Sequence, residues 1–196
     1  MLGAGGWGLG LRLFVALDLD DDARRAITAL QHRVAEALGA DRSIKTVDPA
    51  RMHLTLAFLG EIADRDVPAI VDTLSIDIVV PRFAAVFQGL GVFPPRGAPR
   101  ILWLGVGDGS HEIVEVQQVV ARRLEGLGIA LEPRPFHPHL TLARWRTSRP
   151  ADRSRVLSAD SRGAVARVNV DHVTLYQSRL SSAGPAYTAL TRADLT

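Results

Sequence analysis

The spacing of apolar residues along the chain changes between two periods and predicts a series of strands and helices. Residues 12–19 contain the apolar run Leu13–Leu17, which is typical of a buried strand. From 23 to 38, apolar residues recur at helical spacing, acidic residues precede them and Gly39 ends the run, as expected for a helix. The elements expected in the first half are a strand over 12–19, a helix over 23–38, a strand over 52–59, a helix over 64–74 and a strand over 83–92.

The second half of the chain repeats this series with a different sequence. We expect Leu131 to begin a short strand before a proline-rich bend at 133–138. Residues 164–178 are long enough to form one extended strand or a pair of strands. The other expected elements are a strand over 100–106, a helix over 110–124, a strand over 139–145, a short helix over 151–158 and a last strand over 186–191.

The repeated series indicates an internal duplication and therefore an α+β fold. We expect a duplicated bilobal architecture, in which two antiparallel sheets flank a central cleft and the helices lie on the outside. The Gly-rich segment 1–11 is interpreted as a flexible leader. The remainder, 12–196, is a single domain by length, with two pseudo-twofold-related lobes over about 12–98 and 99–196.

A four-residue motif occupies the second strand of each half. It reads His53-Leu54-Thr55-Leu56 in the first and His139-Leu140-Thr141-Leu142 in the second. Side chains alternate between the two faces of a strand, so the His and Thr of each motif share one face and the two Leu point into the core. If the motif strands face each other, two imidazoles and two hydroxyls meet at one site.

Composition limits what this site can be. The chain has no cysteine, which excludes disulfides, thiolate metal sites and a cysteine nucleophile. The net charge of only +2 provides no general attraction for nucleic acid, so any site for a polyanion is local. The sequence lacks a signal peptide and an apolar run long enough to span a membrane, and we expect a soluble, cytoplasmic protein that is a monomer by default.

Three interpretations of the paired histidines follow from their chemistry. Zinc binds three or four protein ligands, and neither motif has an acidic residue at a suitable spacing, so we expect no metal and no cofactor. A single histidine on a strand is most often structural, but two unrelated structural histidines have no reason to share the same motif. One neutral and one protonated imidazole can act as general base and general acid, which is what hydrolysis of a phosphodiester requires.

The residues around both motifs also resemble a known family. The runs Arg51–Gly60 and Arg134–Arg144 look like the paired motifs of the two-histidine phosphoesterases. They are most similar to those of the bacterial and archaeal RNA 2′,3′-cyclic phosphodiesterases, formerly described as 2′-5′ RNA ligases. The segments Arg12–Leu17 and Val173–Ser178 share this resemblance, which therefore covers nearly the whole chain.

The resemblance implies metal-independent opening of an RNA 2′,3′-cyclic phosphate to a 2′-phosphomonoester. By analogy His53 is the proton donor and His139 the proton acceptor, a division that the residues alone leave open. Thr55 and Thr141 would bind the phosphate, and Arg144 matches an arginine that follows the second motif in the family. On strict alternation Arg144 faces away from His139, so it reaches the site only if the strand ends or bulges there.

Contacts to the rest of a substrate are less defined. Phe14 and Tyr176 are candidates for stacking on a base, and Arg134 for contacting RNA. The expected partner is an RNA that ends in a 2′,3′-cyclic phosphate, or a small cyclic nucleotide, with no membrane or protein partner implied. The motif does not distinguish these from other cyclic phosphates, from 2′-5′ linked nucleotides or 2′-5′ ligation, or from a non-catalytic module that binds RNA ends.

Overall fold

The expected alternation of strands and helices is present in the computed structural model, which describes residues 10–39, 43–159, 163–182 and 184–196. Two short 3₁₀ turns, η1 (Pro49–Arg51) and η2 (Asp64–Asp66), accompany the main elements. The strands are β1 (Leu11–Leu17), β2 (Ile44–Thr46), β3 (Leu54–Ile62), β4 (Phe83–Phe93), β5 (Ile101–Val106), β6 (His139–Trp145), β7 (Ala164–Val170), β8 (His172–Ser181) and β9 (Gly184–Asp194), and the helices are α1 (Asp21–Leu38), α2 (Val67–Leu74), α3 (Ser110–Gly126) and α4 (Pro150–Ser158).

The α+β class is confirmed, and the differences from expectation are local. β1 begins at Leu11, so this residue is not part of the leader, and residues 1–9 lie outside the described part of the chain. The strand expected at Leu131 is absent, and β2 was not expected. The long segment 164–178 forms two strands, β7 and β8, which belong to different sheets.

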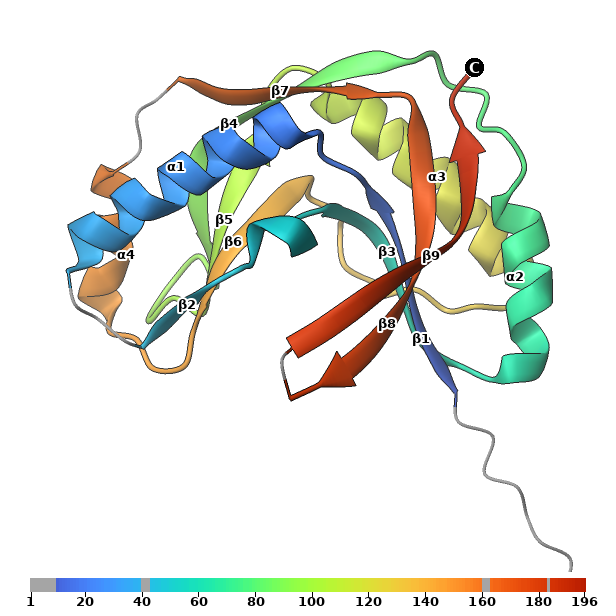
Figure 1. Cartoon of the computed structure of the whole chain (residues 1–196), viewed down its shortest axis with the longest axis horizontal. Coiled ribbons are helices and arrows are strands. Elements are labelled where there is room, and N and C mark those ends of the chain that lie inside the picture. The colour runs from blue at the N-terminus through green and yellow to red at the C-terminus, as the bar shows by residue number, and fades with distance from the viewer. Residues whose placement is uncertain (1–9, 40–42, 160–162, 183) are drawn as a thin grey trace, which may run out of the picture.

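The strands form two antiparallel sheets that exchange strands between the halves of the chain (Figure 1). One sheet has the order β3-β1-β8-β9 and the other the order β2-β6-β5-β4-β7. In both, the motif strand pairs with the strand that opens its own half: β3 with β1, and β6 with β5. The next strand comes from the opposite half, β8 in the first sheet and β4 in the second, so these three strands of each sheet correspond, whereas β2 has no counterpart in the first sheet.

The helices are exchanged in the same way. α1 follows β1 but packs against β7 and α4, whereas α3 follows β5 but packs against β3 and α2 (Figure 1). A boundary near residue 98 therefore does not separate the two sheets, because each sheet with its helices contains segments from both sides of it. The predicted lobes are replaced by two intertwined ones.

Local sequence explains how the motif strands are held. Asp20 caps α1 by accepting a hydrogen bond from the backbone N–H of Ala23 at 2.7 Å. From the buried face of α1, the Gln31 amide donates to the carbonyl of Leu142, a motif residue, at 2.8 Å. The leucines of both motifs are buried as predicted: Leu54, Leu56, Leu140 and Leu142 are 0%, 3%, 0% and 0% exposed.

Candidate active site

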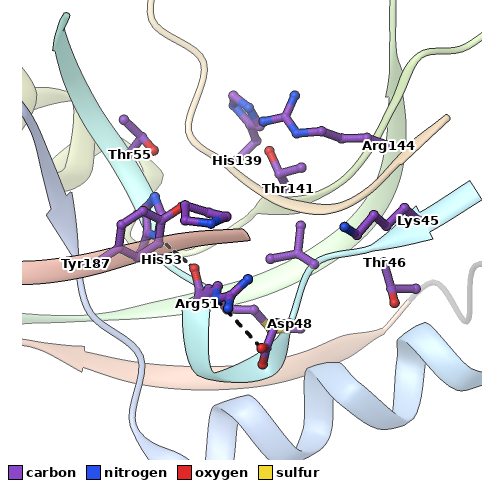
Figure 2. Close-up of a pocket in the computed structure, with 13 residues that line it drawn as sticks. Lys45, Thr46, Asp48, Arg51, His53, Thr55, His139, Thr141, Arg144 and Tyr187 are labelled. Carbon is purple, nitrogen blue, oxygen red and sulfur yellow. Dashed lines mark hydrogen bonds and ion pairs between the residues drawn. The ribbon is translucent and has the colours of Figure 1, made fainter. Parts of the chain in front are cut away.

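The two motifs meet at one cavity of about 510 Å³, a size typical of small-molecule sites. Figure 2 shows the first motif with Tyr187 on one side of the cavity and the second motif with Arg144 on the other. The convergence expected from the repeated motif is therefore present in the fold. The cavity is lined by Lys45, Thr46, Val47, Asp48, Arg51, Met52, His53, Thr55, His139, Thr141, Arg144, Pro185 and Tyr187.

A β-bulge in the second motif turns Arg144 toward this cavity. In the pairing of β5 with β6, Leu102 is opposite Ala143 and Trp103 is opposite Thr141, so Leu142 has no partner. Leu142 and Ala143 are consecutive buried residues, and after them the alternation is reversed. Arg144 consequently shares a face with His139 and Thr141.

The first motif has the same bulge. Val15 is opposite Ala57 and Ala16 is opposite Thr55, which leaves Leu56 unpaired. The residue equivalent to Arg144 is Phe58, whose ring is 44% exposed and has the guanidinium carbon of Arg12 5.1 Å from its centroid. Both copies of the motif thus have the β-bulge, but the equivalent position after it is a cation, Arg144, in one copy and an aromatic residue, Phe58, in the other.

Each motif histidine is fixed through the same ring nitrogen. Nδ1 of His53 lies 2.9 Å from the carbonyl oxygen of Arg51, and Nδ1 of His139 lies 2.7 Å from that of His137. A carbonyl only accepts hydrogen bonds, so Nδ1 donates in both cases. This leaves Nε2 of each imidazole to give or take a proton in the cavity.

Burial lowers the pKa of both histidines below the ordinary value of 6.5. For His53 the hydrogen bond to Arg51 and the charge of Asp18 partly oppose this shift, whereas the charge of Arg24 adds to it. For His139 the hydrogen bond to the His137 carbonyl opposes it, whereas nearby cationic Arg144 adds to it. Neutral imidazole is therefore favoured at both positions when the cavity holds no anion.

The rings of Phe14 and Tyr187 contact the imidazole of His53. Phe14 stacks on its ring with centroids 4.7 Å apart, and Tyr176 stacks on Phe14 at 5.3 Å. Tyr187 meets the His53 ring edge-on at 5.3 Å. Phe14 is only 4% exposed within these contacts, and its stacking on a base stays a prediction.

Tyr176 is held by a carboxylate that the motif analysis did not identify. Its hydroxyl donates to Asp18 at 2.6 Å, and the hydroxyl of Thr174 donates to the same carboxylate at 2.8 Å. His172 lies between Asp18 and Asp171, with its ring nitrogens 3.2 and 2.5 Å from their oxygens. Tyr176 is not among the residues that line the main cavity, and its contact with a base stays a prediction.

The protonation of this cluster follows from its hydrogen bonds. Burial by itself raises the pKa of Asp18, but the bonds from Tyr176, Thr174 and His172 lower it below its usual value. Burial and the adjacent Asp18 raise the pKa of Tyr176 to about 12. Asp18 is therefore negatively charged, and it accepts a hydrogen bond from Tyr176 at the end of the Tyr176–Phe14–His53 ring stack.

Replacing Asp18 by Asn should affect both stability and the titration of His53. The loss of hydrogen bonds to a charged acceptor should lower the free energy of unfolding by about 1–3 kcal/mol in thermal or urea unfolding. Because the Asp18 charge raises the pKa of His53, its removal should move the His53 titration, measured by NMR, to lower pH. Asp171→Asn is the matched control, since this exposed carboxylate contacts His172 but not Tyr176. An equal shift in both variants would contradict a role for Asp18 in particular.

A second cavity of about 410 Å³ adjoins the first and shares Thr55 and His139 with it. Its walls include Phe58, Phe93 and Phe136. Arg134 also lines it and forms an ion pair with Glu132 at 2.8 Å, so the structure places this predicted residue near the site but outside the main cavity.

The part of the chain that the structure describes contains neither a cluster suited to a metal ion nor a helix suited to crossing a membrane. No group of three His, Cys, Asp or Glu side chains in this part of the chain is arranged to hold a metal ion. None of its helices has the length and apolar content that crossing a membrane requires.

The fold and the paired motif can be compared with known proteins. A model of the 2′-5′ RNA ligase superfamily matches residues 21–181. The chain belongs to this superfamily. The resemblance predicted from the two motifs is therefore confirmed.

Members of the superfamily align over most of this chain. A protein named RNA 2′,3′-cyclic phosphodiesterase from Archaeoglobus fulgidus is 34% identical over 179 residues, which cover 90% of this chain and 96% of the relative. Its namesake from Aeropyrum pernix is 37% identical over 149 residues, covering 75% and 84%. The crystal structure of Escherichia coli LigT with NADP⁺ has a TM-score of 0.73 and 26% identity, covering 96% and 99%.

Several residues that line the main cavity lie outside the motifs and were not predicted. Tyr187 is placed by the β8-β9 hairpin, and Lys45 by the short strand β2. Arg51 belongs to the first recognised run, but no role was assigned to it; its side chain lies 3.8 Å from Asp48. A cation two residues before the motif histidine was the one available signal.

Proposed function

We propose that the protein hydrolyses terminal 2′,3′-cyclic phosphates of RNA to 2′-phosphomonoesters without a metal ion. The observation that supports this most directly is the equivalent setting of the two histidines. Both present Nε2 to a cavity that also contains a threonine from each motif. Opening a cyclic phosphodiester with water needs one group to take a proton and one to give a proton, on opposite sides of the phosphorus.

In the proposed reaction, water attacks phosphorus while His139 Nε2 takes its proton. The bond from phosphorus to O3′ breaks, and protonated His53 donates a proton to O3′. The 2′ ester remains, and a proton shift between the histidines restores the starting state. Each proton transfer is typically worth about 10²–10⁴-fold in rate.

Thr55, Thr141 and Arg144 are proposed to bind the reacting phosphate. Two hydroxyls and one guanidinium suit its non-bridging oxygens, on which negative charge accumulates as the nucleophile attacks. Burial, with Arg144 nearby, lowers the pKa of His139, which favours the neutral form that a base requires. The pKa of His53 is lowered as well, so the assignment of His139 as acceptor and His53 as donor rests on the family resemblance.

The comparisons support the same activity and leave the substrate range open. Eight relatives with 26–37% identity carry the name RNA 2′,3′-cyclic phosphodiesterase. E. coli LigT has been crystallised with 3′-AMP and with phosphate, which are chemically close to the product proposed for this chain. Arg134 and the aromatic second cavity are proposed to contact the RNA. The site is built from a single chain, so the proposal requires only a monomer, acting on RNA in the cytoplasm.

The direct test is turnover of an oligonucleotide that ends in a 2′,3′-cyclic phosphate, in the presence of EDTA. We expect a 2′-phosphomonoester, identified by ³¹P NMR and by its resistance to enzymes specific for 3′-phosphates. Absence of turnover, or turnover that disappears with EDTA and returns with a divalent cation, would reject the proposal.

The pH dependence should reflect the lowered pKa of both histidines. The base must be neutral and the acid protonated, so kcat/KM falls on both sides of a maximum midway between the two pKa values. Burial lowers each pKa below 6.5, and the maximum should therefore lie on the acidic side of that value. Above it, kcat/KM should decline about tenfold per pH unit. A maximum above about pH 7 would show that the free site is not tuned in this way.

A further inference from the structure

The main cavity contains more positive charge than the reacting phosphate requires. Lys45, Arg51 and Arg144 line it, and Asp48 is the single carboxylate among the lining residues. Asp48 faces Arg51 at 3.8 Å and accepts a hydrogen bond from the backbone N–H of Ala50. A cyclic phosphodiester carries about one negative charge, so the excess charge on the Lys45 side remains uncompensated when it binds.

Lys45 and Arg144 form a like-charge pair. They are directly opposite in the pairing of β2 with β6, and both extend into the cavity (Figure 2). Like charges at directly opposite positions destabilise a strand pair. Within the described ranges, neither side chain forms an ion pair with a carboxylate. An anion between them would offset the repulsion.

Lys45 also differs chemically from the other cationic residues of the chain. It is the only lysine among the 196 residues, and every other permanently cationic side chain is an arginine. An ammonium group is a compact charge with three rotatable donors, which suits a phosphate whose position varies with the attached nucleotide. The rigid guanidinium of Arg144 complements it by approaching from the neighbouring strand.

We propose that Lys45 binds a second phosphate beside the reacting phosphate that Arg144 holds, so that the preferred substrate carries a phosphate in addition to its 2′,3′-cyclic end. This inference rests on the proposed function and specifies its substrate class. In an RNA, the second phosphate is the internucleotide phosphodiester on the 5′ side of the terminal nucleoside. A mononucleotide with a 5′-phosphate offers the same chemistry. The site therefore prefers polynucleotide ends to nucleoside 2′,3′-cyclic phosphates that lack a second phosphate.

The test compares two dinucleotides that both end in a 2′,3′-cyclic phosphate. One has an ordinary phosphodiester linkage and the other an uncharged methylphosphonate linkage. We expect the native protein to prefer the charged linkage by about tenfold in kcat/KM, the factor that corresponds to about 1.4 kcal/mol. In Lys45→Gln this preference should largely disappear, and Lys45→Arg should retain it, because the coupling requires both charges.

Controls separate this inference from general electrostatics and from the function itself. Arg33→Gln removes an exposed charge on α1 that does not line the cavity, and it should leave the preference in place. A 5′-phosphorylated cyclic mononucleotide as a third substrate shows whether a terminal phosphate is sufficient. Equal turnover of both dinucleotides by the native protein would overturn the second phosphate site alone, and so would an unchanged preference in Lys45→Gln. Failure to open any cyclic phosphate would instead overturn the proposed function.

Discussion

Replacing either motif histidine by Gln should reduce kcat/KM on a 2′,3′-cyclic oligonucleotide by about 10²–10⁴-fold. In the proposed reaction, His53→Gln removes the proton donor and His139→Gln removes the base, and both histidines act in the same step. The double variant should consequently be only slightly slower than the slower single variant. Losses that multiply in the double variant would indicate that the two residues act independently.

A thio-substituted substrate can distinguish the two roles. When sulfur replaces O3′ in the cyclic phosphate, the leaving thiolate needs no proton. We therefore expect His53→Gln to recover most of its lost rate on this substrate, relative to the native protein. His139→Gln should remain slow, because water still has to lose a proton. The reverse pattern would exchange the roles of acid and base, and matched thermal unfolding curves would show that both variants are folded.

Replacing either motif threonine by Val should lower kcat by about 10²-fold. Valine keeps the branched shape that suits a strand and removes the hydroxyl that is proposed to bind the phosphate. Because Thr55 and Thr141 occupy equivalent places in the duplicated site, the two losses should be similar. Single-turnover kinetics would show whether the chemical step is slowed.

Thr188→Val provides the matched control for the threonine variants. Thr188 is exposed on β9 and does not line the cavity, so its replacement tests the effect of the same chemical change elsewhere on a strand. A loss confined to KM in Thr141→Val would show that the hydroxyl binds ground state and transition state equally well. An unaffected rate would remove the threonines from the proposed mechanism.

The sequence predicts those parts of the site that depend on local periodicity. Two-residue alternation places His53 with Thr55 and His139 with Thr141, and the structure agrees. The position of Arg144 depends on the unpaired Leu142, and a bulge has no signature in a single sequence beyond two consecutive apolar residues. The sequence therefore predicts that Arg144 needs a bulge or a strand end to reach the cavity, but it does not predict that the bulge is present.

The remaining parts of the site depend on pairing between distant segments. Lys45 reaches the cavity because a strand of only three residues pairs with β6, and Tyr187 because β9 folds back on β8. Neither segment shows a local pattern that predicts its partner. The same reason explains the wrong lobe boundary, since nothing near β4 or β8 indicates that each joins the sheet of the opposite half.

The exchange of β4 and β8 restricts what a chain with only one motif can be. Such a chain would leave its sheet without its third strand, and a second copy, related by a twofold axis, would supply it. We therefore expect a chain with one motif to form a strand-swapped homodimer with two identical histidines at its symmetry axis. Joining the copies in one gene removes that identity. It permits Arg144 to differ from Phe58, and a proton donor to differ from a proton acceptor.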